Sequence, residues 1–417
     1  MKFMNHMFDA NKNHTRSSGC KDDSGHRDSR GNKIRFRSVS TFGIALILAA
    51  AMFLAGCTGS NPKELSGEAE GGDKVIKIGM VGPLTGDYAT YGVSVRNGVQ
   101  TAIDEINAEG GINGYTLKLI AEDSKGQSTE AANAVQKLID QDKVTAIVGA
   151  VLSGETATVA PIAQDSGVLM VTPSSTAPGL TDVGDYIFRN VITDDAQAQQ
   201  MAEYAVTQLD LNKFAVIYAN NDYGVALKDN FIAKAQELGA TIVGVESYLD
   251  GDEDFRAQLT KIGNGAEALY VAGYYTEAAK IAQQARRQGI EARLLGADGF
   301  YSEKLVELGG DAVEGSVFTA GFYSGDTSEA VQAFVSNYKQ KYSQEPDMFA
   351  ANAYDTMKIV AQALAKAGND RAALKDEMFN IKDFPGVTGN TSFDANGEAV
   401  KDVVFLRVEN GTFVRAD

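Results

Sequence analysis

The stretch that decides the fold is VIKIGMVGPLTGDYATYGVSVRNGVQTAIDEI, which covers residues 75–106. It opens with a short apolar run at residues 75–81, which predicts a buried strand. Apolar residues then recur on one helical face, at positions i, i+4, i+7, i+8 and i+11. These residues are Val95, Val99, Ala102, Ile103 and Ile106. The stretch therefore predicts a strand followed by an amphipathic helix.

The same alternation continues along the chain in two series. The first series predicts strands at 116–121, 144–148 and 168–171 and helices at 131–139 and 155–164. The second starts after about residue 192, with helices at 196–209, 226–238, 255–262 and 277–288 and strands at 214–218, 241–245, 268–271 and 293–295. Residues 328–379 are mostly helical in pattern, and a strand follows at 403–408. This pattern predicts an α/β fold of two lobes, each a doubly wound, mainly parallel sheet covered on both faces.

The N-terminal region has the pattern of a secretory signal. A basic cluster of Lys33, Arg35 and Arg37 precedes an apolar run of 16 residues at 41–56. That run is short for a transmembrane helix, which needs about 20 residues, and suits a signal h-region. It ends in Leu54-Ala55-Gly56 before Cys57, which resembles a bacterial lipoprotein signal. We therefore expect residues 1–56 to be removed and Cys57 to carry a lipid; the alternative is an uncleaved membrane anchor.

Removal of residues 1–56 changes what chemistry the chain can perform. His6, His14, His26 and Cys20 all lie in the removed segment, so the mature chain would keep no His and only the lipidated Cys57. Catalytic Ser-His-Asp and Cys-His arrangements and His- or Cys-ligated zinc are thereby excluded. The removed segment holds nine Lys or Arg and four Asp or Glu, so the net charge falls from −17 to −22. Such an acidic chain is not expected to bind nucleic acid.

No pattern points to a cofactor or a metal ion. The chain contains neither the Gly-rich dinucleotide fingerprint nor a Walker A motif. The acidic run from Asp250 to Asp254 starts like a calcium-binding loop, but position six, where the loop needs a glycine for its sharp turn, is Phe255, and position twelve, where a bidentate Glu is required, is Lys261. Residues 57–73 are rich in Gly, Ser and acidic residues, which predicts a flexible tether.

Several stretches, taken in their order along the chain, resemble one protein family. They are Gly82-Pro83-Leu84-Thr85-Gly86 with Tyr91-Gly92, Ile106-Asn107-Ala108-Glu109-Gly110-Gly111-Ile112-Asn113-Gly114, Thr172-Pro173-Ser174-Ser175-Thr176-Ala177-Pro178, Asn221-Asp222-Tyr223-Gly224, Gly251-Asp252-Glu253-Asp254-Phe255, Ala272-Gly273-Tyr274-Tyr275, Gln284-Ala285-Arg286 and Ala353-Tyr354-Asp355. The chain from about Lys74 onward is similar to the substrate-binding proteins of branched-chain amino-acid ABC transporters, of the leucine/isoleucine/valine-binding type.

The resemblance implies a type I periplasmic-binding-protein fold. Two α/β lobes are joined by three crossing strands that act as a hinge, and the ligand binds in the cleft between the lobes. The family pattern places lobe one at residues 74–192 plus 321–398. Lobe two would comprise residues 193–320 plus 399–417.

Three candidate residues would bind the ligand's carboxylate. Ser153 follows a strand and opens a helix, where free N–H groups and the positive end of the helix dipole suit an anion. In the family the matching Ser contacts the ligand carboxylate, as do a Thr matching Thr176 and backbone groups at the position of Ser174. The alternatives are a plain helix-capping role for Ser153 and turn chemistry for the Pro-flanked loop.

The resemblance assigns an acid and several aromatic residues to the rest of the site. Asp298 matches an acid that pairs with the ligand ammonium, although an Asp-Gly pair is more often only a turn. Tyr223 and Tyr274 match aromatics that close over the ligand, and Tyr91 matches an aromatic near the side-chain pocket. Tyr354 is a weaker match. A buried tyrosine is more often part of the core than a ligand contact.

Together these features predict a binding protein and not an enzyme. The expected ligand is a small amino acid, leucine, isoleucine or valine, delivered to an ABC permease with ATPase subunits. We expect a monomer held at the cell envelope by the lipid on Cys57, on the outer side of the cytoplasmic membrane or in the periplasm. Alternatives are the same scaffold binding an amide, urea or an aromatic acid, a sensory receptor, and, least favoured, an extracellular enzyme with carboxylate catalysis.

Overall fold

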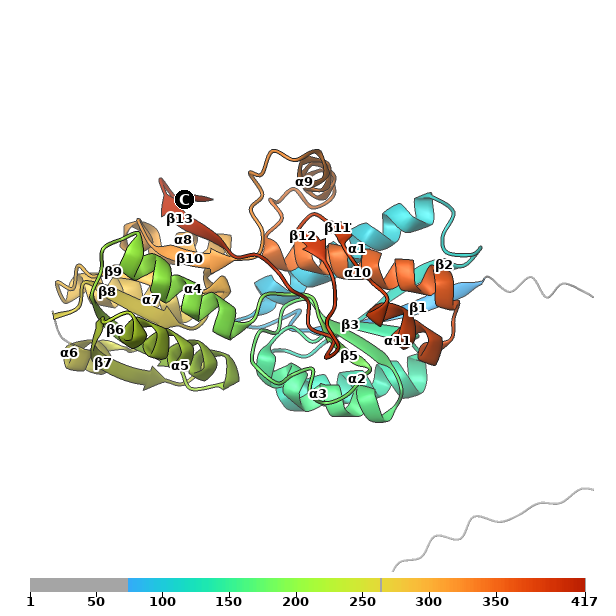
Figure 1. Ribbon diagram of the computed structural model, residues 1–417, viewed down its shortest axis with the longest axis horizontal. Helices are drawn as coiled ribbons and strands as arrows, with labels where there is room; N and C mark the ends of the chain where they lie inside the picture. Colours follow the sequence, from blue (N-terminus) through green and yellow to red (C-terminus); the bar gives the residue numbers. More distant parts are fainter. Residues whose placement is uncertain (1–73, 263–264, 417) are drawn as a thin grey trace, which may run out of the picture. The chain divides into compact units, whose positions relative to one another are not determined.

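The computed structural model describes residues 74–262 and 265–416 (Figure 1). The predicted signal segment, the tether and Cys57 lie outside the described residues. Within the described part of the chain, no helix combines the length and the apolar character needed to cross a bilayer.

Lobe one is built on a five-stranded, all-parallel sheet of the described residues, in the order β2-β1-β3-β4-β5. Its strands are β1 (Val75–Gly82), β2 (Thr116–Asp123), β3 (Ala146–Gly149), β4 (Leu169–Thr172) and β5 (Ile187–Arg189). Ile78 of β1 pairs with Leu119 on one side and Ala146 on the other. The central strands are almost wholly buried, which is why they are continuous apolar runs in the sequence.

Helices cover both faces of this sheet. They are α1 (Ala89–Ala108), α2 (Ser128–Lys137), which ends in the π turn η1 (Leu138–Asp142), α3 (Ser153–Asp165), α10 (Met348–Ala367) and α11 (Arg371–Phe379). A further helix, α9 (Glu329–Tyr342), packs on α1. One apolar cluster joins Ile78 and Met80 to α1 and α10, and a second joins Val81 and Ile147 to α2 and α3. A side chain at Gly98 would come within 2.1 Å of the Ala350 carbonyl oxygen, so glycine is what lets α1 and α10 pack so closely.

Lobe two is built on a seven-stranded sheet of described residues, in the order β14-β13-β10-β9-β8-β6-β7. Its strands are β6 (Lys213–Ala219), β7 (Thr241–Tyr248), β8 (Ala268–Ala272), β9 (Arg293–Gly296), β10 (Val317–Ala320), β13 (Val404–Glu409) and β14 (Thr412–Arg415). The strands from β6 to β10 are parallel, whereas β13 and β14 add antiparallel at one edge.

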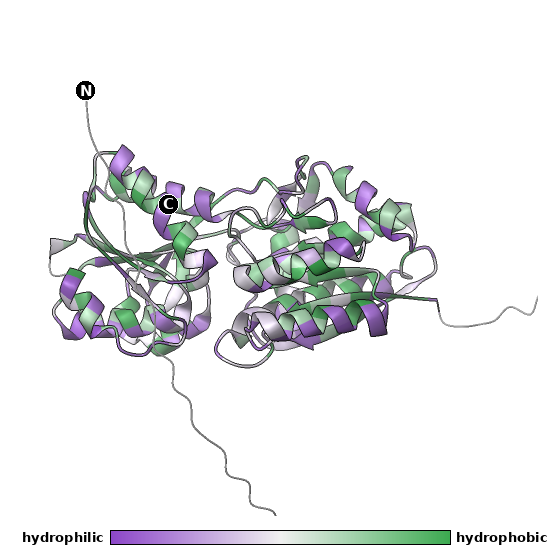
Figure 2. Ribbon diagram, turned by 90° about the horizontal axis from the view of Figure 1, so that it is seen from below, coloured by the Kyte–Doolittle hydropathy of each residue, from purple (hydrophilic) through white to green (hydrophobic). Residues whose placement is uncertain are grey.

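The helices of lobe two lie ahead of its first strand, β6, and in the connections between its strands. They are α4 (Asp194–Thr207), α5 (Asp222–Glu237), α6 (Arg256–Ile262), α7 (Tyr275–Arg287) and α8 (Glu303–Gly309), with the short 3₁₀ turns η3 (Asp298–Phe300) and η4 (Gly310–Val313). Helix α4 packs beside α5, and α7 packs beside α8. Figure 2 shows hydrophobic strands between helices that are striped with hydrophobic and hydrophilic residues, as expected for surface helices that bury one face.

The chain crosses between the two sheets three times. It leaves lobe one after β5, returns after β10, and leaves again after the hairpin of β11 (Phe384–Gly386) and β12 (Gly389–Thr391). The predicted α/β fold of two doubly wound, mainly parallel sheets is therefore confirmed. The sequence pattern missed the short strand β5, because three residues are too few to show any periodicity.

Candidate functional site

Residues from both lobes line one cavity of about 260 Å³. Lobe one contributes Tyr91, Val151, Leu152, Ser153, Ser174, Thr176 and Phe349, and lobe two contributes Tyr223, Tyr274, Asp298 and Gly299. Seven of the eight ligand-binding residues predicted from the sequence are in this set. They come from the carboxyl ends of strands in both sheets and from the starts of the helices that follow, which is where open α/β sheets bind ligands.

The hydroxyl of Ser153 forms the centre of the polar wall of lobe one. Leu152 takes the N-cap position of α3, with φ −90° and ψ 145°, so Ser153 is the first helical residue and not the cap. The Ser153 Oγ instead accepts hydrogen bonds from the backbone N–H groups of Thr176 and Ala177, each at 3.3 Å. Since its oxygen accepts both bonds, its own O–H proton is available to an acceptor in the cavity. The simple capping role is therefore wrong for Ser153.

The loop after β4 places Ser174 and Thr176 beside Ser153. The Ser174 hydroxyl donates to the Val151 carbonyl oxygen at 2.8 Å, which ties this loop to the loop after β3. The carbonyl oxygen of Thr176 accepts a hydrogen bond of 3.0 Å from the backbone N–H of Asp194. The two loops thus form one hydrogen-bonded unit in which backbone N–H groups and hydroxyls gather at the start of α3. The Thr176 and Ala177 N–H groups and the Ser174 hydroxyl are already bonded within this unit. The donors left for a carboxylate are the Ser153 hydroxyl and the unpaired N–H groups at the start of α3.

Asp298 supplies the negative charge on the wall formed by lobe two. Its Oδ1 accepts hydrogen bonds from Tyr223 Oη at 2.8 Å and from Gln197 Nε2 at 3.2 Å. The side chain is only 2% exposed, and burial raises the pKa of Asp298 to about 6. The Asp-Gly pair starts the turn η3, but the carboxylate accepts hydrogen bonds from residues of two helices, α4 and α5. It is therefore more than a turn former.

Two polar residues of α4 belong to this site and were missed from the sequence. Gln197 Oε1 accepts hydrogen bonds from the backbone N–H of Asp298 at 3.1 Å and from Thr319 Oγ1 at 2.9 Å. Asp194 is fully buried, and burial followed by the negative charge of Asp298 raises the pKa of Asp194 well above its usual value. A signal was present, because the first helical turn after the predicted first lobe carries Asp194, Asp195 and Gln197. Asp194 and Gln197 are buried whereas Asp195 is exposed, and this difference depends on tertiary packing, which the local pattern does not reveal.

Aromatic and aliphatic side chains form the remaining walls. The rings of Tyr223 and Tyr274 stack with centroids 4.9 Å apart at an angle of 11°. Tyr91 packs against Phe349, with ring centroids 4.5 Å apart. Together with Val151 and Leu152, Phe349 gives the cavity an apolar side. These three residues were also missed, because a buried apolar residue looks the same in a sequence whether it lines a cavity or fills the core.

Tyr354 is not among the residues that line this cavity. Its Oη donates to Glu105 Oε2 at 2.6 Å, and its ring packs on Phe334 with centroids 4.7 Å apart. The reason is helical geometry, because Phe349 of the same helix α10 faces the cavity and a step of five residues turns the side chain by about 140°. The structure therefore separates Tyr354 from the other seven predicted residues.

Comparisons with known proteins agree with this architecture. The family model described as periplasmic binding protein matches residues 75–412. The chain is 32% identical over 327 residues to the Leu/Ile/Val-binding protein homolog 3 of Brucella melitensis, covering 78% of this chain and 88% of that protein. It is 30% identical over 325 residues to the leucine-, isoleucine-, valine-, threonine- and alanine-binding protein of Pseudomonas aeruginosa, covering 78% of this chain and 87% of that protein.

Solved structures show the same similarity. The branched-chain amino acid transporter substrate-binding protein LivJ of Streptococcus pneumoniae, in complex with isoleucine, is 38% identical with a TM-score of 0.78. The leucine-binding protein LivK of Thermotoga maritima is 35% identical with a TM-score of 0.77. Each comparison covers 82% of this chain and 98% of the other.

The fold, the sequence comparisons and the solved structures therefore point to the same protein family. Proteins of this family are extracytoplasmic substrate-binding proteins of transporters and not enzymes. The predicted resemblance is confirmed: this chain belongs to the periplasmic binding protein family, with the type I fold of the branched-chain amino-acid substrate-binding proteins of ABC transporters.

Proposed function

We propose that this protein binds leucine, isoleucine or valine in the cavity between its lobes and delivers it to an ABC permease driven by ATPase subunits. One observation carries the proposal: a cluster of hydrogen-bond donors around Ser153 and a buried carboxylate at Asp298 line the same small cavity. This arrangement matches the two charges of an amino acid. The apolar side formed by Val151, Leu152 and Phe349 then suits an aliphatic side chain.

The carboxylate of the ligand would bind to lobe one. Ser153 can donate its O–H proton while its oxygen keeps the two bonds from Thr176 and Ala177. Because Ser153 is the first residue of α3, its backbone N–H is one of the unpaired donors at the helix start. The helix dipole adds a favourable interaction with the negative charge.

The ammonium group of the ligand would bind to Asp298 in lobe two. Both side-chain donors to Asp298 bind Oδ1, so Oδ2 is the oxygen that we assign to the ammonium. A hydrogen bond to a charged partner contributes about 1.5–3 kcal/mol. Burial and the negative charge of Asp298 raise the pKa of the neighbouring Asp194, so the neutral form of Asp194 is favoured beside this site. Since the two charges of the ligand bind different lobes, binding favours closure of the hinge.

The volume of the cavity restricts the ligand to a small molecule. At most about 260 Å³ of space is empty between the lining residues, because this volume includes space that is open to solvent. The stacked rings of Tyr223 and Tyr274 and the ring of Tyr91 enclose it. A branched aliphatic side chain of three or four carbons is the ligand class that we infer.

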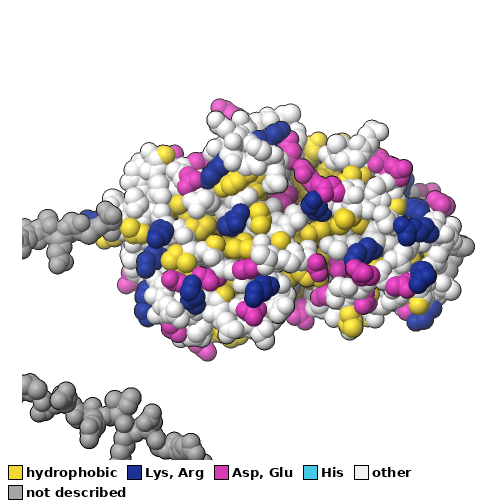
Figure 3. Space-filling view, turned by 180° about the vertical axis from the view of Figure 1, so that it is seen from behind, with side chains coloured by type: hydrophobic (Ala, Val, Ile, Leu, Met, Phe, Trp, Pro, Cys, Tyr) yellow, Lys and Arg dark blue, Asp and Glu magenta, His cyan; other side chains and the backbone are white. Residues whose placement is uncertain are grey.

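We further propose that residues 74–192 plus 321–398 form lobe one and that residues 193–320 plus 399–417 form lobe two. The protein is a monomeric lipoprotein, tethered by residues 57–73 and anchored through Cys57 at the cell envelope. Figure 3 shows Lys/Arg and Asp/Glu side chains interspersed on one face of the molecule, which fits a tethered protein in water. A Cys57→Ser variant should lose both incorporation of labelled fatty acid and its place in the membrane fraction. Unchanged labelling would overturn the anchor.

Calorimetric titration tests the ligand. The protein, freed of co-purified ligand by mild denaturation and refolding, is titrated with leucine, isoleucine and valine, and with leucinamide and 4-methylpentanoate as analogues that lack one charge. We expect binding of at least one amino acid and at least 100-fold weaker binding of both analogues. Asp298→Ala should abolish measurable binding of the amino acids. Absence of heat with all three amino acids, or a preference for an amide or an aromatic acid, would contradict the proposed ligand.

A further inference from the structure

Arg189 is a buried cation that does not line the ligand cavity. It ends β5, and its side chain is only 2% exposed. Its guanidinium binds Glu398 with two parallel hydrogen bonds, Nε to Oε2 at 2.6 Å and Nη2 to Oε1 at 2.7 Å. A bidentate pair of this kind fixes the plane of the guanidinium as well as its position. The remaining nitrogen, Nη1, is thereby pointed in a defined direction.

That nitrogen holds the loop that carries Thr176. Arg189 Nη1 donates to the carbonyl oxygen of Ala177 at 2.5 Å and to that of Ser175 at 3.5 Å. The carbonyl oxygen of Thr176, between them, is held by the backbone N–H of Asp194. Three successive carbonyl groups are therefore bound by donors from outside the loop.

These contacts determine the direction of the backbone N–H groups on the other side of the loop. Since the peptide group is planar, fixing the carbonyl oxygens of Ser175 and Thr176 also fixes the N–H groups of Thr176 and Ala177. Those are the two N–H groups that donate to Ser153 Oγ. Arg189 contacts the Ser175 carbonyl oxygen at 3.5 Å and anchors the next part of the loop through Ala177, whereas Asp194 holds the Thr176 carbonyl oxygen. Arg189 thus acts on the carboxylate-binding wall through the backbone of the loop, without lining the cavity itself.

Glu398 belongs to the third crossing between the lobes. The backbone N–H of Arg189 donates to the Gly397 carbonyl oxygen at 2.9 Å, and the N–H of Ala399 donates to the Arg189 carbonyl oxygen at 3.0 Å. Gly397 has φ 78°, and a side chain there would lie 2.7 Å from the carbonyl oxygen of Ile187, so glycine is required for this approach. The same crossing thus pairs with β5 and provides the carboxylate that orients Arg189.

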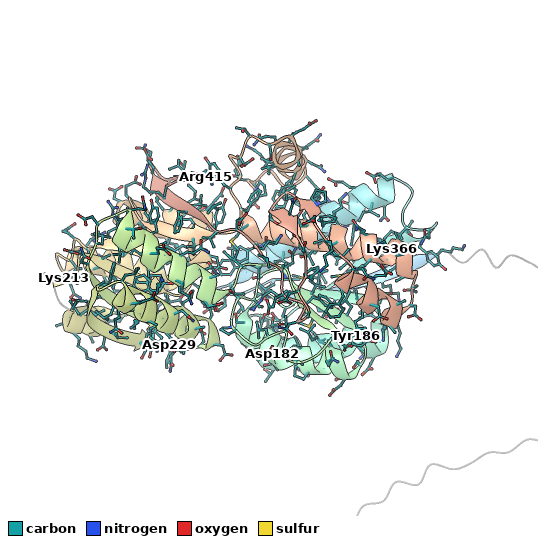
Figure 4. The ribbon with its side chains drawn as sticks, viewed as in Figure 1. Asp182, Tyr186, Lys213, Asp229, Lys366 and Arg415 are labelled. Atoms are coloured by element: carbon teal, nitrogen blue, oxygen red, sulfur yellow. The ribbon has the colours of Figure 1, made fainter. Side chains whose placement is uncertain are left out.

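A further hydrogen bond strengthens this link. Thr181 Oγ1, on the segment between β4 and β5, donates to Glu398 Oε1 at 2.6 Å. Figure 4 labels Asp182 and Tyr186 on the same segment of lobe one. Glu398 therefore binds both Arg189 and the far end of the loop that Arg189 holds.

We propose that Arg189, oriented by Glu398, is a positioning residue that sets the loop at residues 175–177 for the ligand carboxylate. This inference rests on the proposed binding of an amino acid by the Ser153 wall. It predicts that the affinity for the carboxylate depends on an ion pair that does not touch the ligand. Because Glu398 lies on a hinge crossing, the pair also joins the hinge to the binding loop.

The test compares ligands with and without a carboxylate. Arg189→Lys keeps the charge but loses the bidentate geometry, Glu398→Gln keeps the shape but loses the charge, and Thr181→Val removes only the hydroxyl. Binding constants for leucine and leucinamide are measured by competition with labelled leucine, so that weak binding still gives a constant. The control is Arg407→Lys, which alters the exposed ion pair of Arg407 with Glu409 in lobe two.

We expect Arg189→Lys and Glu398→Gln to weaken leucine binding at least 10-fold and leucinamide binding less than twofold, with a smaller effect of the same kind for Thr181→Val. The control should change neither constant. If the ion pair only stabilises the fold, the variants should have a lower melting temperature, and binding of leucine and leucinamide should weaken by the same factor or stay unchanged. Either result would overturn the proposal. If the wild-type protein binds no leucine, isoleucine or valine, the proposed function fails and this inference fails with it. Wild-type binding with unchanged ligand ratios in all three folded variants overturns this inference alone.

Discussion

The hydroxyl of Tyr91, on α1 in lobe one, donates a hydrogen bond of 2.5 Å to the backbone carbonyl oxygen of Gly299 in lobe two. The hydroxyl oxygen of Tyr91 in turn accepts a bond of 3.3 Å from the backbone N–H of Tyr275 in lobe two. One phenol therefore joins the two lobes beside the cavity. Its ring also packs against Phe349, which places the contact between the lobes and the apolar wall on a single side chain.

Tyr91→Phe should weaken the closed arrangement of the lobes while keeping the ring. The variant loses the bond to Gly299 and the bond from Tyr275, and each hydrogen bond of this kind contributes about 0.5–1.5 kcal/mol. We expect about 10-fold faster ligand dissociation, measured by stopped-flow fluorescence, with little change in the association rate. Tyr115→Phe, a tyrosine outside the cavity, is the matched control. Equal dissociation rates in the wild type and Tyr91→Phe would show that the hydroxyl does not hold the lobes together.

Ligand affinity should fall as the pH drops through the pKa of Asp298. Burial raises this pKa to about 6, and only the ionised carboxylate pairs with an ammonium group. Below pH 6, a proton competes with the ligand, so the dissociation constant should rise up to tenfold per pH unit. Asp347, the N-cap of α10, also has a pKa raised to about 6 by burial, so a control is needed. Asp347→Asn should keep the pH dependence of binding. If the pH dependence disappears in that variant, Asp347 and not Asp298 is the acid that causes it.

Asp298→Asn should stabilise the protein in the absence of ligand. The folded-state pKa of about 6 lies above the ordinary value of 3.8, so folding favours the protonated form. At pH 7 the ionised carboxylate therefore lowers the free energy of unfolding, and this cost should disappear as the pH falls from 7 toward 4. Asparagine retains an oxygen that can accept from Tyr223 and Gln197. We expect a gain of about 1–3 kcal/mol in urea unfolding at pH 7, together with loss of ligand binding; a destabilised variant would contradict the expectation.

Phe349→Ala should change which ligand is preferred. The substitution enlarges the apolar side of the cavity, so we expect leucine to bind at least 10-fold more weakly and phenylalanine to gain affinity relative to leucine in calorimetric competition. Removing a buried Phe also costs about 3–5 kcal/mol of stability. Phe334→Ala, in the core of lobe one away from the cavity, controls for this loss. An unchanged ratio of leucine to phenylalanine affinity would place the side-chain pocket elsewhere.

The site could be predicted from the sequence to different extents at different residues. Asp298 and Ser153 follow strands and resemble family motifs, so their place at the cavity could be expected, although their roles toward a ligand remain predictions. Gln197 does not directly follow a predicted strand and belongs to no quoted family motif. Its importance comes from hydrogen bonds to residues 101 and 122 positions away in the chain. Tyr354 matched a motif but lies on a different face of α10 from Phe349.

The alternation of strands and helices could be read directly from the amino-acid sequence, because burial of a sheet between helices requires apolar residues with periods that are visible locally. The sequence also excluded histidine and cysteine chemistry from the chain after Cys57. Only the tertiary structure decided which loop ends meet. The bonds of Tyr223 and Gln197 to Asp298, and of Arg189 to Glu398 and Ala177, join segments far apart in the chain. The raised pKa of Asp298 likewise arises from its burial, and burial is a property of the packed fold and not of any local stretch.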